Sequence, residues 1–314
     1  MARIRYEAVE AKTVLNRVKA PSMPFEWSLN PYRGCQHGCS FCYARSTHTF
    51  LGMSADDTFQ KHILIKKNAA ESLARHLEKL KSAKKGGVFA EHVAVGTATD
   101  PYQPVEAKAM LTRSCLQILQ HHRISVSITT RSPLILRDID ILREMPAVSV
   151  NVSINTLNEA VWKQLEPASP HPKKRLETVQ QLAENGIHAG IFLAPIVPYL
   201  TDRTDDLHEL IRSAAQHKAQ FVIPSILRLN GDEVRNWFFQ TLERIDCRLL
   251  PKYRSLYLRS AAVPRNYREP LMRTVAALLQ KYGLSDQSPE TSSSTAGSGA
   301  TPANGQPVQL EFSF

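Results

Sequence analysis

The sequence has no apolar run long enough to cross a bilayer, and residues 1–20 contain no apolar stretch of signal-peptide length. A disulfide framework is also excluded, because only five cysteines occur in 314 residues and three of them share one short stretch. The hydrophobic content of 43% is enough for one large core. We therefore expect a soluble, cytoplasmic protein built on a single main domain.

Lysine and arginine are missing from the tail that begins at residue 285. This tail holds three of the 29 acidic residues and none of the 39 basic ones, so residues 1–284 carry +13, compared with +10 for the whole chain. Such an excess favours a polyanionic partner, although it can also serve solubility alone.

Two stretches, residues 61–85 and 244–273, are especially basic. The second interleaves arginines with three tyrosines, which are Tyr253, Tyr257 and Tyr267. Arginine for phosphates and aromatic rings for bases is the composition of a nucleic-acid interface, whereas a solvated helical face is the alternative interpretation.

Cys35, Cys39 and Cys42 form a C-x3-C-x2-C pattern, and neither Cys115 nor Cys247 is close to it in sequence. Three thiolates on one loop can hold three irons of a [4Fe–4S] cluster, whereas electron-transfer clusters normally use four cysteines. The fourth iron would then stay open to a small molecule. The alternative is a zinc site completed by a nearby histidine, either His37 or His48.

The stretch Gly34–Arg45, with aromatic residues on both sides of Cys42, resembles the radical S-adenosylmethionine (SAM) enzymes. The resemblance implies that the open iron binds SAM and that the reduced cluster cleaves it to a 5′-deoxyadenosyl radical. It also implies an electron donor such as flavodoxin or ferredoxin. Phe41 resembles the aromatic residue of the family that lies beside the adenine.

Strands and helices alternate along the core of the sequence. The predicted strands are Phe25–Leu29, Val93–Thr97, Ile124–Thr130, Val148–Asn155, Ile187–Val197 and Phe221–Leu227. The predicted helices are Asn68–Ser82, Ala107–His122, Leu134–Met145, Arg175–Asn185, Asp205–His217, Asp232–Ile245 and Glu269–Tyr282. This alternation indicates an α/β fold with parallel strands. Six units match the partial (β/α)6 barrel that the resemblance implies, two short of a closed TIM barrel.

Polar residues follow the strands at the edge where parallel α/β barrels place their active sites. Thr99 and Asp100 suit the SAM ammonium group, although Asp100 could simply cap a helix. Ser153 and Asn155 share one face of the fourth strand and suit ribose or carboxylate contacts. Arg175 lies where the family often has a basic residue for the SAM carboxylate, and is otherwise a surface arginine.

The stretch from Thr99 to Pro104 and the Glu166-Pro167 loop narrow the resemblance to the spore photoproduct lyase-like branch, over about residues 21–265. That branch implies repair of a DNA lesion by a lyase, in which a cysteine returns a hydrogen atom. Cys115 lies on an apolar helix face and Cys247 follows the last barrel helix, so neither is a convincing donor. We expect a radical SAM enzyme acting on nucleic acid; the alternatives are modification of RNA or protein, or a nucleic-acid-binding iron–sulfur protein without catalysis.

The predicted organisation has five parts: an N-terminal extension (1–20), the barrel (21–265), a C-terminal helix (266–284), a disordered linker (285–307) and a docking peptide (308–314). The last six residues, Gln309 to Phe314, resemble the Q-L-x-L/F-x-L/F hexapeptide that bacterial proteins use to bind the sliding clamp. The alternative is an additional edge strand on the chain's own barrel.

Overall fold

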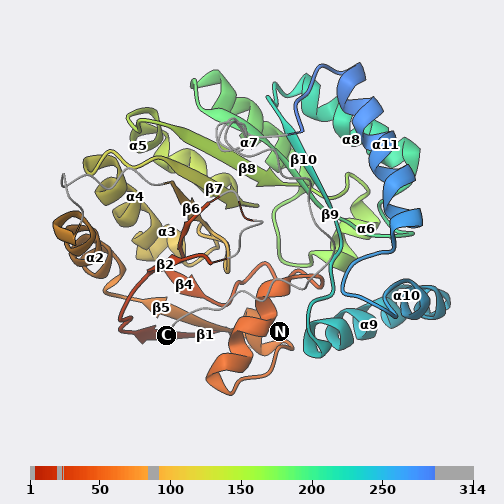
Figure 1. The fold of residues 1–314 in the computed structure, drawn as a ribbon, viewed down its shortest axis with the longest axis horizontal. Helices are drawn as coiled ribbons and strands as arrows, with labels where there is room; N and C mark the ends of the chain where they lie inside the picture. Colours follow the sequence, from red (N-terminus) through yellow and green to blue (C-terminus); the bar gives the residue numbers. More distant parts are fainter. Residues whose placement is uncertain (1–3, 20–22, 24, 84–91, 287–314) are drawn as a thin grey trace.

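The computed structural model describes residues 4–19, 23, 25–83 and 92–286. The strands form a seven-stranded sheet in the order β10-β9-β8-β7-β6-β3-β2 and a three-stranded sheet in the order β1-β5-β4 (Figure 1). Their bounds are β1 Arg5–Val9, β2 Leu15–Arg17, β3 Trp27–Leu29, β4 Tyr32–Arg33, β5 His62–Lys66, β6 Val93–Val95, β7 Val126–Thr130, β8 Val148–Ser153, β9 His188–Ile196 and β10 Val222–Ile226.

Helices surround the outer face of the curved main sheet (Figure 1). The described helices, including η1, α9 and α10 at the lower edge of the molecule in Figure 1, are η1 Tyr43–Leu51, α1 Thr58–Lys61, α2 Ala69–Ala83, α3 Glu106–Ala109, α4 Leu111–His121, η2 Pro133–Asp138, α5 Ile139–Arg143, α6 Glu159–Leu165, α7 Pro172–Glu184, α8 Thr204–Gln216, α9 Asp232–Asp246, η3 Cys247–Leu249, α10 Leu250–Leu256 and α11 Arg265–Lys281. Helix α8 shows why they pack in this way. Its buried side chains recur at helical spacing, namely Leu207, Leu210, Ile211 and Ala214.

The predicted partial barrel is confirmed. Strands β3, β6, β7, β8, β9 and β10 pair in parallel and in sequence order, and β2 adds an antiparallel edge strand beside β3. Parallel pairing places the carboxyl ends of all six strands at one edge of the sheet. The loops that carry the predicted site residues begin at this edge. Among the described strands, β2 and β10 lie at opposite ends of the sheet and do not pair with each other, so this barrel is not closed.

Helix boundaries differ most from prediction around Met110. The predicted helix Ala107–His122 is two helices, α3 and α4, because Met110 adopts a left-handed conformation with φ of 52°. The carboxylate of Glu106 accepts hydrogen bonds from the backbone amides of Thr112 (3.0 Å) and Arg113 (3.3 Å) at the start of α4. A carboxylate at a helix N-terminus is favourable, which explains the break.

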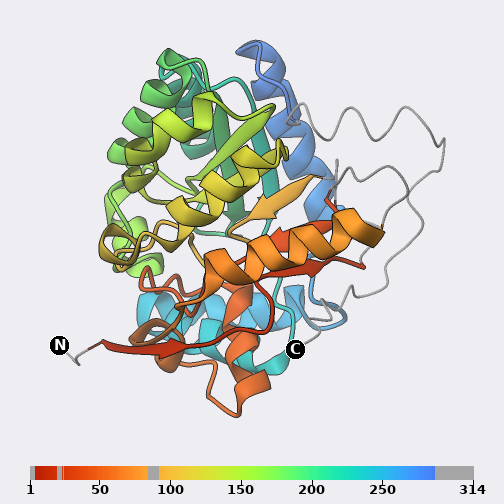
Figure 2. The same cartoon turned by 90° about the vertical axis from the view of Figure 1, so that its left-hand side faces the viewer.

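The N-terminal residues are integrated into the sheets. Strand β1 pairs with β5 and β2 pairs with β3, so the described part of the predicted extension contributes to both sheets. Sequence patterns missed β2 because it has only three residues, and missed β1 because none of its side chains is fully buried, so it shows no apolar alternation. The turned view in Figure 2 shows β1 running along the side of the molecule that carries the N-terminus.

The predicted linker and docking peptide fall almost entirely outside the described residues, which end at 286. At their start, Ser285 forms a parallel bridge with Phe221, beside β10. Among the helices that the structure describes, none is long and apolar enough to span a membrane.

Candidate active site

The cysteine loop lies between β4 and η1, and backbone hydrogen bonds fold it into consecutive turns. The amide of Cys35 donates to the carbonyl of Phe59 (3.1 Å), and the amide of Cys42 donates to the carbonyl of Cys39 (3.3 Å). The amide of Ser40 donates to the carbonyl of Leu165 at the end of α6 (2.9 Å). The loop is therefore held by one internal turn and by two other segments, α1 and α6.

Two glycines make this path possible. Gly34 has φ of +81°, and a Cβ there would lie 2.8 Å from the carbonyl oxygens of His62 and Phe59. Gly38 has φ of +65°, and a Cβ there would lie 2.5 Å from the side-chain oxygen of Gln60. A larger residue would therefore be strained at either position.

The three thiols of the loop are free; Cys35 and Cys39 are buried and Cys42 is half-buried. Burial raises the pKa of Cys39 to about 12, although Arg131 opposes this shift. Burial also raises the pKa of Cys35, and charge on Asp100, Cys39 and Cys42 raises it further. Charge on one thiol of this loop thus disfavours charge on its neighbours, whereas a bound metal centre favours the thiolate form.

This donor set fits a cluster. A cubane binds each cysteine through a different iron, so its thiols need not converge on a single point. Within the described ranges, no group of three or more histidine, cysteine or acidic side chains is placed to hold one metal ion. His37, one of the two histidines considered for zinc, instead lies 3.2 Å from Asp100 through its Nε2 atom.

The loop after β6 clamps the cysteine loop through side chains. The hydroxyl of Thr99 donates to the carbonyl of Gly34 (2.6 Å), and the Nε2 of Gln103 donates to the same carbonyl (3.1 Å). The Oε1 of Gln103 accepts from the amide of Gln36 (3.1 Å). Gln103 was not singled out from the sequence, because nothing local to it indicates a partner so far along the chain.

The carboxylate of Asp100 accepts hydrogen bonds from its own loop and from the end of β7. Its Oδ1 accepts from the amide of Tyr102 (2.9 Å) and the hydroxyl of Thr130 (2.6 Å), and its Oδ2 accepts from the amide of Arg131 (2.7 Å). Burial opposes ionisation, but His37 and these hydrogen bonds lower the pKa of Asp100 to about 2. Asp100 is thus an ionised carboxylate that joins two loops, and its contact with SAM stays a prediction.

Arg175 is buried. Its guanidinium donates to the carbonyl of Ser153 (2.9 Å) and pairs with Glu166, which also accepts from the Nε of Arg131 (3.0 Å). The two arginines outweigh the effect of burial and lower the pKa of Glu166 to about 2. The interpretation of Arg175 as a surface arginine is therefore wrong. Its contact with the SAM carboxylate remains a prediction.

Asn155 and Phe41 are two further residues that the sequence analysis assigned to the SAM site. Both are buried, and the Nδ2 of Asn155 has no hydrogen-bond partner among the described residues. A buried amide without a partner is costly, and a bound ligand can satisfy it. The guanidinium of Arg131 lies 5.7 Å from the centre of the Phe41 ring. The contacts of Asn155 and Phe41 with SAM stay predictions, and Arg131 is a further residue beside Phe41.

The nucleic-acid interpretation of two tyrosines is wrong. Tyr253 and Tyr257 are buried, and their hydroxyls donate to the carbonyls of Pro198 (2.5 Å) and Leu227 (2.9 Å). Neither ring can stack on a base. The alternation of aromatic and basic residues arises because α10 turns one face to the core and the other to solvent.

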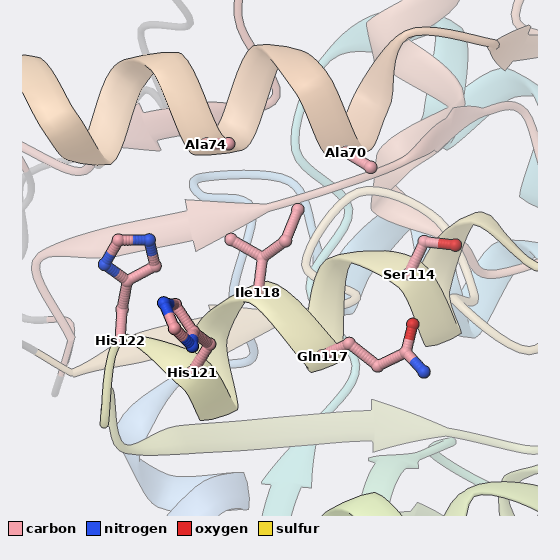
Figure 3. Close-up of a pocket in the computed structure, with 7 residues that line it drawn as sticks. All are labelled: Ala70, Ala74, Ser114, Gln117, Ile118, His121 and His122. Atoms are coloured by element: carbon pink, nitrogen blue, oxygen red, sulfur yellow. The ribbon is translucent and has the colours of Figure 1, made fainter.

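The other two cysteines lie as expected. Cys115 is fully buried on α4 and Cys247 is exposed after α9. An open groove of about 450 Å³ lies between α2 and α4, lined by Ala70, Ala74, Ser114, Gln117, Ile118, His121 and His122 (Figure 3). It belongs to the outer helical layer, not to the edge that carries the cysteine loop.

Comparisons with known proteins agree with this geometry. The family model described as the radical SAM superfamily matches residues 29–212. A Mycobacterium tuberculosis protein is 33% identical over 285 residues, which span 90% of this chain and 82% of that protein. The radical SAM Nalpha-GlyT isomerase of Pseudomonas phage M6 is 24% identical over 223 residues, 71% of this chain and 43% of that protein.

Among solved structures, spore photoproduct lyase in complex with a dinucleoside spore photoproduct has a TM-score of 0.66 and 15% identity, covering 88% of this chain and 79% of that one. This likeness concerns the fold. Members of the matching superfamily use a [4Fe–4S] cluster and SAM. The family match, the partial barrel and the three-cysteine loop at its carboxyl edge together show that the chain belongs to the radical SAM superfamily.

Proposed function

We propose that this chain binds a [4Fe–4S] cluster through Cys35, Cys39 and Cys42 and cleaves SAM to act on nucleic acid. The observation that carries the proposal is the loop itself, which holds three free, largely buried thiols where all six barrel strands end. When bound, the cluster and SAM would supply one-electron chemistry and hydrogen-atom abstraction from a substrate.

The chain's own residues would position these groups. The unpaired amide of Asn155 is available to a ligand, and Phe41 offers an apolar surface beside the cysteines. Thr99 and Asp100 fix the loops around the site through their hydrogen bonds. The buried edge would also exclude water from reactive species.

Exposed cations near the same edge support a nucleic-acid substrate. Helix α10 is attached to the ends of β9 and β10 by the Tyr253 and Tyr257 hydroxyls, so it borders the carboxyl edge. The exposed basic side chains on and after α10 include Lys252, Arg254, Arg259, Arg268 and Arg273. Cations of this kind position phosphates without reading sequence.

Tyr199, just after β9, suits base stacking better than the buried tyrosines. It is 40% exposed, and its backbone is left-handed with φ of 63°. Its ring makes edge contacts with Tyr253 (6.0 Å) and Tyr267 (5.7 Å), and the Nζ of Lys252 lies 5.3 Å from its centre. A fixed, exposed aromatic ring beside a cation is a stacking platform for a base.

DNA is the substrate that the comparisons favour. Spore photoproduct lyase has been solved with a dinucleoside photoproduct bound, so lesion repair is the first activity to test. The sequence-based proposal of a sliding-clamp peptide at Gln309–Phe314 would fit a DNA substrate, because the clamp encircles DNA. That peptide lies outside the described residues.

Anaerobic reconstitution with iron and sulfide, followed by SAM, dithionite and defined DNA, RNA or peptide substrates, tests the proposal by mass spectrometry. We expect SAM cleavage and a mass change in DNA that carries a lesion. A change in RNA or peptide alone would favour the alternative substrates. An iron-loaded protein that never cleaves SAM would favour the alternative of a nucleic-acid-binding iron–sulfur protein without catalysis.

A direct binding assay tests the proposed interface. DNA affinity should fall steeply as salt rises from 50 to 200 mM, since phosphate contacts release counterions. Tyr199→Ala should weaken binding by about 1–3 kcal/mol, the usual value of one stacked base, whereas Tyr199→Phe should preserve it. Equal affinity of wild type and Tyr199→Ala would remove Tyr199 from the interface.

A further inference from the structure

Arg45, on η1, is a fully buried cation directly behind the cysteine loop. Its Nε donates to the carbonyl of Cys39 (3.1 Å), and its Nη2 donates to the carbonyl of Gly38 (3.1 Å) and to the Oε1 of Gln60 (2.8 Å). Its Nη1 donates to the carbonyl of Asp56 (2.7 Å). The guanidinium is thus fixed by four neutral acceptors, two of which belong to the cysteine loop.

The guanidinium is also held between aromatic rings. Its central carbon lies 4.5 Å from the centre of the Trp237 ring, on α9, and 5.5 Å from that of Phe59. Helix α9 follows the last barrel strand, and in Figure 1 it lies next to η1 at the lower edge of the molecule. Arg45 therefore joins the two ends of the open barrel.

Nothing described compensates the charge of Arg45 by direct contact. None of its hydrogen bonds goes to a carboxylate, and the carboxylate of the nearby Asp57 instead binds Lys61 and Gln60. Leaving a buried charge unpaired is strongly unfavourable. The hydrogen bond from the Nε of Arg45 to the carbonyl of Cys39 places this charge beside one of the proposed cluster ligands.

We propose that Arg45 is a positioning residue for the iron–sulfur cluster, which compensates the charge of the ligating thiolates while fixing the backbone that presents them. Reduction adds a negative charge to the cluster, and a cation close to that charge favours the reduced state. Trp237 keeps the guanidinium in place through its ring face. Arg45 therefore sets how readily the cluster accepts an electron.

This inference rests on the proposed cluster at the three cysteines. Its test is a redox titration of the reconstituted protein, followed by EPR, without SAM or substrate. We expect Arg45→Gln to disfavour cluster reduction about tenfold, a shift of about 59 mV to more negative potential for one electron. Arg45→Lys keeps the charge and should stay closer to wild type.

Arg244 provides a matched control. It is exposed, and its guanidinium lies 6.0 Å from the centre of the same Trp237 ring. Arg244→Gln should leave the reduction potential unchanged. A wild-type protein without a cluster would contradict the proposed function, whereas a normal potential in loaded Arg45→Gln would overturn only the role of Arg45.

The iron content of the reconstituted variants keeps the proposal testable if Arg45→Gln takes up little iron. Arg45→Lys keeps the charge but cannot make all four hydrogen bonds, so we expect it to take up more iron than Arg45→Gln. A purely structural role predicts equal losses of iron in the two variants. Equal iron content in Arg45→Lys and Arg45→Gln would therefore overturn the proposed electrostatic role.

Discussion

The hydroxyl of Thr99 donates a 2.6 Å hydrogen bond to the carbonyl of Gly34, which joins the loop after β6 to the residue that precedes the first cysteine. Both ends of this bond are buried, and its loss would leave the carbonyl of Gly34 with the Nε2 of Gln103 as its remaining side-chain donor. Through it, the second barrel strand determines where the first cysteine lies.

Replacing Thr99 should therefore affect the cysteine loop. Thr99→Val keeps the shape but leaves the Gly34 carbonyl with one fewer donor, at a cost of about 1–3 kcal/mol. We expect lower stability and faster loss of iron from the reconstituted protein, measured by urea unfolding and by release of iron to a chelator. Thr99→Ser keeps the hydroxyl and serves as the control. Equal iron release from wild type and Thr99→Val would contradict this role.

Cys35, Cys39 and Cys42 should each be required for the cluster. Cys39→Ala should abolish the visible absorption of the reconstituted protein and the EPR signal of its reduced state, because one iron loses its ligand. Cys247 is exposed and distant in sequence, so Cys247→Ala is the control. An intact cluster in Cys39→Ala would refute the ligand assignment.

Glu166 should make stability depend on pH. Its pKa falls from an ordinary value of 4.5 to about 2, despite burial, because of Arg175 and Arg131. A lowered pKa means that the contribution is present above pH 4.5 and is lost as the pH falls towards 2. Glu166→Gln should cost about 3–5 kcal/mol at pH 7, since it leaves buried arginines without a carboxylate.

Urea unfolding of the metal-free protein at several pH values measures this effect. The difference between wild type and Glu166→Gln should shrink as the pH falls below 4.5. Glu159, an exposed carboxylate on α6, provides the control Glu159→Gln, which should change stability little. A difference that is constant with pH would show that the ion network contributes nothing through charge.

The side-chain amide of Asn155 should donate a hydrogen bond to a bound ligand, and not to another group of the protein. Because its Nδ2 has no partner among the described residues, Asn155→Leu should leave the stability of the metal-free protein unchanged or slightly higher. SAM affinity of the reconstituted variant should fall about tenfold, the equivalent of one hydrogen bond of about 1.4 kcal/mol. Unchanged SAM affinity, measured by equilibrium dialysis, would place Asn155 outside the SAM site.

The terminal peptide should act as a separate module. Deleting residues 308–314 should abolish binding to a purified bacterial sliding clamp, because the apolar residues that would enter its pockets are gone. SAM cleavage and thermal stability should stay the same. A marked loss of stability, without clamp binding by the intact chain, would favour the edge-strand alternative.

The sequence by itself determined the order of strands and helices and the position of the cysteine loop. Alternating apolar residues mark the strands, as in Ile124, Val126 and Ile128, and a short local spacing marks the cysteines. Such patterns are readable because they depend on neighbours within a few residues, which share one strand face or one turn. The polar residues at strand ends were identified for the same reason.

Only the tertiary structure decided how the site is held together. Arg45 contacts Trp237, Asp100 contacts His37 and Arg131, and the Tyr253 hydroxyl reaches Pro198, all between segments far apart in the chain. Whether a charged or aromatic side chain is buried depends on which distant segment packs over it. No local pattern records that packing, so the sequence left Arg45 unnoticed and placed Tyr253 on the surface.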